Sequence, residues 1–200
     1  MRVKTAATVV AMVVSAAAGA ARAQERPRAQ RETATATFDG KKVAIEYGRP
    51  ALRGRTLDAL TAQLPADRIW RAGENQVTTL TADTDLVVGD KRVPAGKYSV
   101  YVHAPAQGNW SLVLNSDPGV PLKQIYAAAP PEVANALWPR LDGYEKVAAM
   151  EVARIPLAAA NPSSPAEHFV IRLEPAKSGA SVLTLLWGDR GWTTTVKPAR

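Results

Sequence analysis

The chain alternates hydrophobic and polar residues in a series of short segments, and each such segment predicts a β-strand. In segment 42–47, for example, Val43, Ile45 and Tyr47 share one side of the extended chain, while the charged residues take the other. A strand with one buried and one solvated face requires this pattern. Asp39-Gly40 directly precedes the segment and is a strong signal for a tight hairpin turn.

The same pattern recurs along the chain. The predicted strands are 33–38, 42–47, 76–82, 86–88, 97–103, 110–115, an extended stretch at 146–157, 169–173, 182–187 and 192–196. We expect hairpins to join 33–38 with 42–47, 76–82 with 86–88, 97–103 with 110–115, and 182–187 with 192–196. The last hairpin would place Trp187 and Trp192 opposite each other.

Helical signals are few. Thr56 can cap a short helix that Pro65 ends, and a second short helix is predicted near 131–137. Strands do not alternate with long helices, so the fold class is all-β. The sequence therefore predicts an antiparallel β-sandwich of about ten strands, with one or two short helices in the connections.

The first 23 residues resemble a secretory signal. Arg2 and Lys4 precede an apolar stretch at 6–18, and Ala21-Arg22-Ala23 supplies small residues for cleavage near Ala23. Residues 24–32 read as a flexible leader and residues 33–200 as a single domain. We therefore expect an exported protein, periplasmic or extracellular, with no transmembrane segment in the mature chain.

Composition excludes several classes of function. The 200 residues contain no cysteine, so disulfides, thiol catalysis and thiolate metal sites are excluded. The formal charge is +7, and Arg2, Lys4 and Arg22 contribute three of those charges within the signal. The mature chain lacks the basic runs with interleaved aromatic residues that nucleic-acid binding favours, so we expect no nucleic-acid partner.

Local motifs for cofactors, metals and catalysis are missing. There is no phosphate-binding or dinucleotide-binding glycine pattern, no nucleophile elbow and no closely spaced histidine pair. Asp83 and Asp85 read as turn formers rather than calcium ligands. We therefore predict no metal, no cofactor and no assigned catalytic residue. A distant carboxylate pair drawn from Glu46, Glu74 and Glu151 stays open.

An arginine-rich connection precedes strand 76–82 and holds most of the candidate binding residues. These are Arg49, Arg53, Trp70, Arg71, Glu74 and Asn75. Guanidinium groups bind planar anions with two parallel hydrogen bonds and stack on aromatic rings. The connection is therefore interpreted either as a pocket for a carboxylate, phosphate or sugar acid, or as a brace in which the arginines pair with nearby acids.

Two further candidates lie on strand 97–103. Tyr98, Val100 and Val102 share one face, so Tyr101 and His103 would line an exposed groove on the other if the first face is core. His168 alternates with Phe169 in the same way. It is expected on a solvated face without a catalytic role.

Four ordered motifs resemble one known family. These are IEYGRP (45–50) with RGR (53–55), WRAGEN (70–75) leading into TTL (78–80), VPAGKYSVY (93–101) and WSLVLN (110–115). The chain is similar through them to the bacterial domain of unknown function 2911 (DUF2911), over residues 33 to 196. The resemblance implies an exported β-rich domain and transfers no catalytic residue. The sequence departs from the family pattern at His103 and in the alanine- and proline-rich segment 120–142.

Three hypotheses for function follow. The leading one is a non-enzymatic binding or envelope-associated module that holds a small anionic or carbohydrate ligand at the arginine-rich connection. The second is a hydrolase acting on a cell-envelope polymer, which needs converging carboxylates or His103 beside a carboxylate. The third is a structural domain that packs on an envelope protein, for which an exposed apolar patch would be the sign.

Overall fold

A computed structural model describes residues 31–140 and 143–199 of the chain. The predicted signal (1–23) and residues 24–30 of the predicted leader lie outside this range. Arg31 and Glu32 were assigned to the leader, but they begin the first strand. Their side chains explain the difference, because each contacts a neighbouring segment: Arg31 Nη2 donates to the carbonyl of Val77 at 3.2 Å, and Glu32 pairs with Arg49.

Strands make up about half of the described chain. Their bounds are β1 (Arg31–Phe38), β2 (Lys41–Gly48), β3 (Ile69–Trp70), β4 (Thr79–Ala82), β5 (Leu86–Val88), β6 (Lys91–Val93), β7 (Gly96–His103), β8 (Ser111–Asn115), β9 (Val120–Pro121), β10 (Leu137–Trp138), β11 (Glu151–Pro156), β12 (Ala158–Ala160), β13 (Ala166–Pro175), β14 (Ser181–Gly188) and β15 (Arg190–Pro198). Two short α-helices, α1 (Leu57–Thr61) and α2 (Leu122–Ile125), and three 3₁₀ turns, η1 (Tyr144–Lys146), η2 (Ala148–Met150) and η3 (Lys177–Gly179), lie between them.

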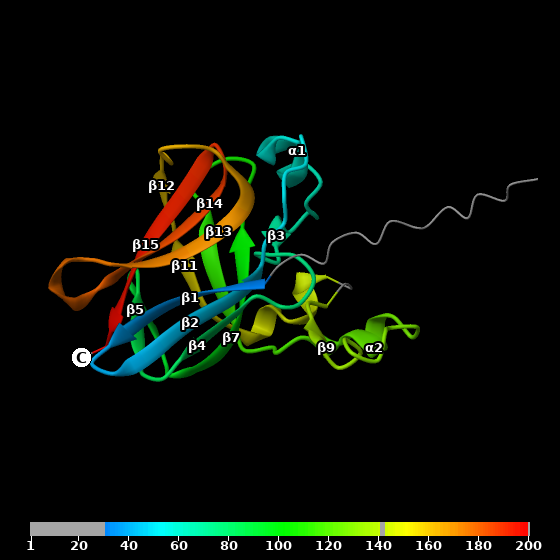
Figure 1. The fold of residues 1–200 in the computed structure, drawn as a ribbon, viewed down its shortest axis with the longest axis horizontal. Helices are drawn as coiled ribbons and strands as arrows, with labels where there is room; N and C mark the ends of the chain where they lie inside the picture. Colours follow the sequence, from blue (N-terminus) through cyan, green and yellow to red (C-terminus); the bar gives the residue numbers. More distant parts are fainter. Residues whose placement is uncertain (1–30, 141–142, 200) are drawn as a thin grey trace, which may run out of the picture.

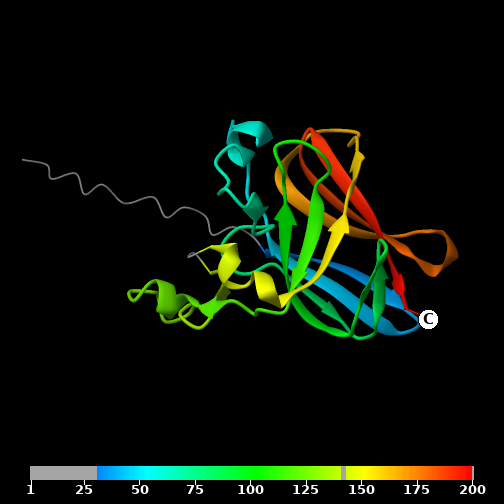
Figure 2. The ribbon, with the colours of Figure 1, turned by 180° about the vertical axis from the view of Figure 1, so that it is seen from behind.

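The strands form two antiparallel sheets that face each other (Figures 1 and 2). The first sheet has the order β1-β2-β4-β7-β8-β11, with β3 also paired to β7. The second has the order β13-β14-β15-β5-β6, with β12 also paired to β15. A small ribbon, β9 with β10, stands apart. The predicted all-β antiparallel sandwich is confirmed; it contains more strands than expected because several have only two or three residues.

The first hairpin forms as its sequence predicts. Asp39 and Gly40 both adopt positive φ, 49° and 78°, which is the geometry of a two-residue hairpin turn. In β2, Val43, Ile45 and Tyr47 are each 1% exposed. They belong to the buried cluster between the sheets, to which the second sheet contributes residues such as Leu183 and Leu185.

The predicted pairing of 76–82 with 86–88 is wrong. β4 pairs with β2 and β7 in the first sheet, whereas β5 pairs with β15 and β6 in the second. The chain crosses between sheets at Asp83-Thr84-Asp85. Asp83 accepts from the Lys42 amide at 3.1 Å, and Asp85 accepts from the Ala95 amide at 2.9 Å. The two aspartates thus form turns, as expected, but they anchor the chain to different elements, β2 and the turn between β6 and β7.

The predicted opposition of Trp187 and Trp192 is also wrong. The β14–β15 turn contains only Gly188 and Asp189, so Trp187 pairs with Arg190 and Leu185 with Trp192. The two indoles therefore stack on other partners. Trp187 lies against Trp70 at 4.9 Å between ring centroids, and Trp192 lies against Trp110 at 4.0 Å.

Residues 116–140 and 143–150, named here the covering segment, replace the predicted irregular stretch and second helix. No helix forms at 131–137, because Val133 and Ala136 donate to carbonyls only three residues earlier, those of Pro130 and Val133. The helix α2 lies earlier, at Leu122–Ile125. The predicted extended stretch 146–157 begins with η1 and η2 and becomes a strand only at Glu151.

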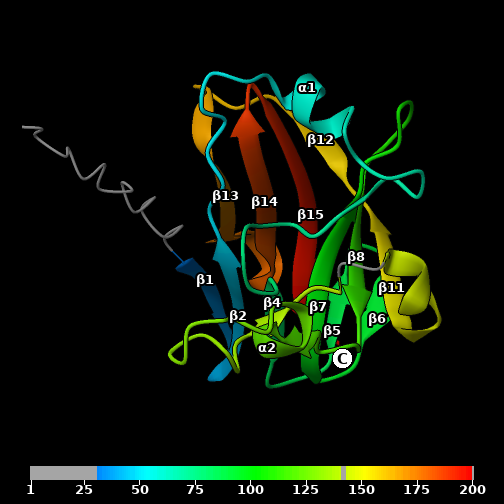
Figure 3. The ribbon, with the colours of Figure 1, turned by 90° about the vertical axis from the view of Figure 1, so that its right-hand side faces the viewer.

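Figures 1 and 2 show the α2 part of the covering segment extending away from the sheets, and in Figure 3 helix α1 lies at the upper end of the strands with α2 far below it. In the described part of the chain, no helix has the length and apolar character needed to cross a membrane.

Candidate functional site

Backbone hydrogen bonds join the arginine-rich connection to the start of β13. The Phe169 amide donates to the Pro50 carbonyl at 2.9 Å, and the Leu52 amide donates to the Glu167 carbonyl at 2.9 Å. Arg53 adopts a positive φ of 53°, and its own amide donates to Oε1 of Glu167 at 2.8 Å. The irregular connection therefore docks through its backbone onto a strand more than a hundred residues later in the chain.

Arg49 is held in place by two contacts. Its Nε donates to the Phe169 carbonyl at 3.3 Å, and its Nη1 forms an ion pair with Glu32. Glu32 also accepts from the Tyr47 hydroxyl at 3.1 Å. The Arg49 side chain is 25% exposed, so one side of its guanidinium still faces solvent. By contrast, the Arg53 side chain is exposed and makes no ion pair with the described residues.

The Trp70 side chain packs against aromatic residues of the core and not against the arginines. Its ring stacks on Trp187 at an interplanar angle of 21° and meets Phe169 edge-on, with centroids 4.8 Å apart. The strand β3 that carries it pairs with β7. Aromatic pairs of this kind stabilise by roughly 0.5–1.5 kcal/mol beyond the area they bury. Trp70 therefore braces the contact between the two sheets.

Arg71, Glu74 and Asn75 form a tight corner after β3. Asn75 and Ala72 both adopt positive φ, 65° and 50°, and the Thr78 hydroxyl donates to the Ala72 carbonyl at 2.9 Å. Burial lowers the pKa of Arg71, while the nearby charge of Glu74 acts in the opposite direction. No hydrogen bond or ion pair among the described residues joins this corner to Arg49 or Arg53, although its backbone lies against Gly48. The predicted set is thus divided between two places.

Tyr101 does not line an exposed groove, and this prediction is wrong. The residue is only 5% exposed, because the covering segment lies over this face of the first sheet. Its ring meets that of Tyr144 at 5.0 Å and 67°. Burial, followed by the charge of Asp117, raises the pKa of Tyr101 to about 12. For His103, which is partly buried, desolvation and then the charge of Arg154 lower the pKa.

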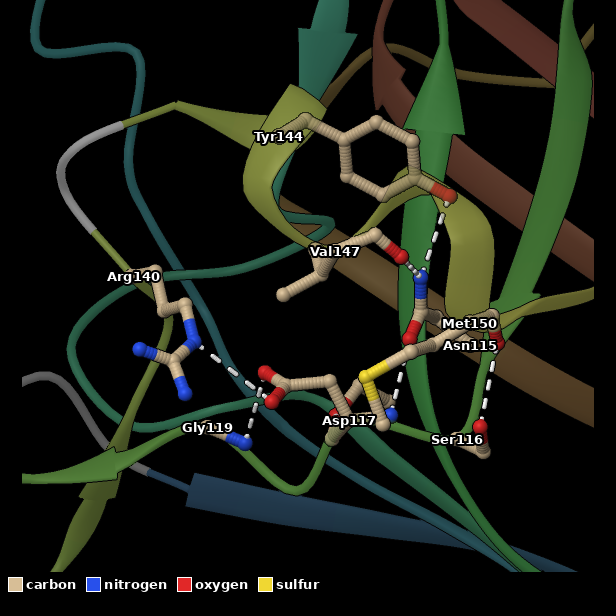
Figure 4. A network of polar contacts seen from close by, with 9 residues as sticks. Asn115, Ser116, Asp117, Gly119, Arg140, Tyr144, Val147 and Met150 are labelled. Carbon is tan, nitrogen blue, oxygen red and sulfur yellow. Dashed lines mark hydrogen bonds and ion pairs between the residues drawn. The ribbon is translucent and has the colours of Figure 1, made fainter.

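A buried polar network fixes the covering segment to the sheet (Figure 4). Asn115 is fully buried, and its Nδ2 donates to the Val147 carbonyl at 2.8 Å and to the Tyr144 hydroxyl at 3.3 Å. Its Oδ1 accepts from the Asp117 amide at 2.8 Å. Asp117 in turn accepts from the Gly119 amide at 3.1 Å. Every hydrogen-bonding atom of the Asn115 amide group is therefore occupied.

Glu151 lies beside this network. The Nε and Nη2 atoms of Arg154 donate to the two carboxylate oxygens of Glu151 at 2.9 and 2.7 Å. The Tyr144 hydroxyl also donates to this carboxylate, at 2.8 Å. The hydrogen bond from Arg154 is the largest of the causes that lower the pKa of Glu151. Its charge also acts on His103. Because both carboxylate oxygens are engaged, Glu151 is arranged as a structural anion.

The other carboxylates named as catalytic candidates lie elsewhere. The charge of Glu46 acts on Arg31, and that of Glu74 acts on Arg71. Among the contacts of the described residues, no two of Glu46, Glu74 and Glu151 form a pair. The same part of the chain contains no group of three histidine, aspartate or glutamate side chains that could hold a metal ion.

A groove of about 440 Å³ lies between the loop at 161–165 and the outward face of β13 and β14, and we name it the β13–β14 groove. Its polar lining includes Arg49, Ser163, Ser164, Glu167, His168, Arg172 and Thr184. The register of β13 shifts between Ala166 and Val170, at the groove wall. Such bulges redirect side chains and are common near functional sites.

Only one residue of this groove was a candidate binding residue from the sequence. Arg49 was a candidate, whereas His168 was assigned to a solvated face, where it indeed lies exposed. Arg172 is exposed on the same strand and makes no hydrogen bond or ion pair with the described residues. The available signal was the alternation of charged residues along β13 next to the proline- and serine-rich loop. The backbone docking of 50–52 onto β13, which brings Arg49 there, has no local sequence signal.

Comparison with known proteins gives one match. A family model described as "Protein of unknown function (DUF2911)" matches residues 29–196. No curated protein and no solved structure matches the chain.

Proposed function

The chain belongs to the DUF2911 family, which carries no assigned function, and we propose that it is a non-enzymatic binding domain for a small organic anion. The β13–β14 groove is the binding site in this proposal. Carboxylates, phosphates and sugar acids are the ligand class, since guanidinium groups pair with planar or tetrahedral oxyanions through parallel hydrogen bonds.

One observation carries the proposal. The groove brings two guanidinium groups, Arg49 and Arg172, and the imidazole of His168 to one surface with a single carboxylate, Glu167. Glu167 already accepts from the Arg53 amide, so part of its charge is compensated. A volume of about 440 Å³ falls within the usual range of about 300–1,000 Å³ for small-molecule sites.

The two arginines have different tasks in this proposal. Arg49 is already oriented by Glu32 and by the Phe169 carbonyl, so little conformational entropy is lost when an anion binds to it. Arg172 makes no hydrogen bond or ion pair with residues 31–140 or 143–199, so its side chain can move to enclose the ligand. Ser163, Ser164 and Thr184 line the same groove and supply the hydroxyl donors that a sugar acid would need.

This placement revises the predicted pocket. In this proposal Arg49 stays in the site and Arg53 flanks it through Glu167, whereas Trp70 packs between the sheets. Arg71, Glu74 and Asn75 belong to the corner after β3 and lie outside the proposed site. Tyr101 and His103 belong to the face under the covering segment. Both interpretations meet at the start of the connection, where Arg49 pairs with Glu32 and also lines the groove. At its end only the brace interpretation is retained, because the charge of Glu74 acts on Arg71.

Arg172→Gln is the decisive variant, because this exposed side chain can be changed without breaking a contact of the described fold. Galacturonate, inorganic phosphate and short acidic peptides are screened by thermal shift and then by calorimetry. We expect at least one anion to raise the Tm of the wild type, and Arg172→Gln to weaken its binding about tenfold, equivalent to about 1.4 kcal/mol. Arg92→Gln removes another exposed arginine away from the groove and serves as the control. If no anion raises the Tm, or Arg172→Gln binds as tightly as the wild type, the proposal is wrong.

Association with an envelope protein is a second candidate, and one observation favours it. The exposed large hydrophobic residues of the described chain, Tyr126, Leu137, Met150 and Val152, all lie in the covering segment or in the adjoining edge strand β11. Replacing Tyr126 and Leu137 together with serine should reduce crosslinking to a membrane-associated partner and leave anion binding unchanged. Equal crosslinking by both proteins would remove this candidate.

Export is part of the proposal and rests on the leader sequence alone. Cleavage near Ala23 would leave a mature chain that begins at Gln24. Expression of the full chain in a Gram-negative host, followed by mass measurement of the periplasmic protein, tests this. An uncleaved product confined to the cytoplasm would contradict export.

A further inference from the structure

A second pocket lies beneath helix α1, and its lining shares no residue with that of the β13–β14 groove. We name it the tryptophan pocket; its volume is about 120 Å³. It is lined chiefly by Leu57, Leu60, Leu64, Trp70, Trp110 and Trp187. Thr61 contributes the only polar side chain of the lining. An apolar cavity of this kind disfavours water and favours hydrocarbon, since water there would lack hydrogen-bond partners.

One wall of the tryptophan pocket is rigid. Trp70 stacks on Trp187, and Trp110 stacks on Trp192 at 4.0 Å with an interplanar angle of 12°. These residues come from β3, β14, the start of β8 and β15, so both sheets hold the wall. The Trp187 indole nitrogen is buried and has no hydrogen-bond partner in the structure. Aromatic faces fixed in this way present a preformed surface to a flat ligand.

The opposite wall, helix α1, has few polar contacts. Helix α1 has five residues, and its N-terminus is capped by Thr56, whose hydroxyl accepts from the Ala59 amide at 3.2 Å. An exposed ion pair between Asp58 and Arg190, 2.8 Å long, ties the helix to β15. Exposed pairs contribute little to stability. This wall is therefore held mainly by apolar contacts: Leu57 belongs to the buried core, and Leu60 and Leu64 pack against it.

Arg68 is not itself a lining residue of the pocket, but it is hydrogen-bonded to one. Arg68 and the lining residue Ala104 exchange two hydrogen bonds: the Arg68 Nε donates to the Ala104 carbonyl at 3.0 Å, and the Ala104 amide donates to the Arg68 carbonyl at 2.9 Å. The remaining guanidinium nitrogens of Arg68 have no described partner. The adjacent Asp67 carboxylate is engaged locally, because its Oδ1 accepts from the Ile69 amide at 3.0 Å.

We propose that the tryptophan pocket binds an aromatic carboxylate with a single phenyl-sized ring. The ring occupies the space between the tryptophan wall and α1, and the carboxylate pairs with Arg68 at the edge. The volume of about 120 Å³ allows no more than one ring, since an apolar cavity of roughly 150 Å³ holds a single benzene. The nearly complete lack of polar lining excludes a sugar ring, whose hydroxyls would lose their hydrogen bonds.

The probe is 3-phenylpropionate, followed by tryptophan fluorescence and by the indole N–H signals in ¹H–¹⁵N spectra. We expect saturable binding that shifts the signals of Trp70, Trp110 and Trp187 and leaves Trp138, which lies in the β9–β10 ribbon, unchanged. This measurement uses the wild-type chain, so it does not depend on the folding of any variant. No saturable shift, or a shift confined to Trp138, overturns the proposal.

Two variants distinguish the contribution of the ligand's ring to binding from that of its carboxylate. Leu60→Trp fills the pocket and should abolish binding of 3-phenylpropionate. Arg68→Gln should weaken the carboxylate about tenfold and leave the neutral amide, 3-phenylpropanamide, unaffected. Equal binding of 3-phenylpropionate by the wild type and Leu60→Trp, or an equal loss of both ligands in Arg68→Gln, contradicts the arrangement. Arg172→Gln should not alter this binding, so the result is independent of the β13–β14 groove.

Discussion

Gly48, at the end of β2, and Gly73, in the corner after β3, lie with their backbones in direct contact. A Cβ on Gly73 would lie 3.2 Å from the Gly48 carbonyl oxygen, and a Cβ on Gly48 would overlap the backbone carbonyl of Glu74. Two chain segments therefore approach as closely as their backbones allow. This approach explains why the corner that carries Arg71 and Asn75 needs glycine, quite apart from any ligand.

Gly48→Ala should destabilise the fold strongly. The added methyl group meets backbone atoms of Glu74, which cannot rotate away as a side chain would, so we expect a loss of about 3 kcal/mol, at the upper end for overpacking. Urea unfolding measures it. Gly54→Ala is the control: its φ is 75°, but nothing lies within 4 Å of the new Cβ, so only the left-handed backbone penalty of roughly 1 kcal/mol applies. Equal losses in both variants would contradict the close approach.

Asn115→Leu should loosen the covering segment. Asn115 satisfies the Val147 carbonyl, the Tyr144 hydroxyl and the Asp117 amide at a fully buried position, and each group left without a partner costs about 1–3 kcal/mol. We expect a loss of at least about 3 kcal/mol in urea unfolding, with faster hydrogen exchange at Val147 and Met150. Ser116→Ala removes one exposed hydrogen bond to the Met150 carbonyl and should cost under about 1 kcal/mol. Unchanged exchange in Asn115→Leu would show that the network does not hold the segment.

Glu151→Gln should change how stability responds to acid. The pKa of Glu151 is lowered in the fold, chiefly by its hydrogen bonds from Arg154. A lowered pKa stabilises the fold above the ordinary carboxyl value of 4.5, and this stabilisation is lost as the pH falls through the folded value. The wild type should therefore exceed Glu151→Gln in Tm at neutral pH, and the difference should shrink below pH 4.5. Glu174→Gln, at an exposed position, should show no such convergence. A Tm difference independent of pH would exclude this role of the carboxylate.

Local patterns predicted the fold class and several hairpins correctly. Alternation in β2 and the Asp39-Gly40 turn are properties of a few adjacent residues, and a strand with one buried face leaves no other register. The pairing of β4 with β5 failed because alternation identifies a strand without identifying its sheet. Asp83 and Asp85 look like a hairpin turn, yet the carboxylate of Asp83 binds an amide of β2 and that of Asp85 binds an amide of the turn between β6 and β7.

The candidate site was harder to predict because it depends on contacts between distant segments. Alternation places Tyr101 on the face opposite Val100, which is correct, but it cannot show that the covering segment buries that face. Arg49 was identified from its residue type. Arg172 and His168 became candidates only because the connection docks on β13 and places Arg49 beside them in the groove. Sequence reasoning thus named the chemistry of the arginines and missed their partners in space.

Tyr101→Phe should protect the protein against alkali. Burial favours the neutral phenol, and the negative charge of Asp117 adds to this, so the pKa of Tyr101 rises from 10 to about 12. Between these two values the unfolded chain loses the proton more readily than the folded one, and stability falls as the pH rises. The wild type should therefore lose more stability than Tyr101→Phe between pH 10 and pH 12, measured by urea unfolding at both ends of that range. Tyr126→Phe changes an exposed tyrosine and should follow the wild type. Parallel losses in the wild type and Tyr101→Phe would mean that Tyr101 ionises as readily in the folded chain as in the unfolded one, and that the covering segment does not shield this face of the sheet.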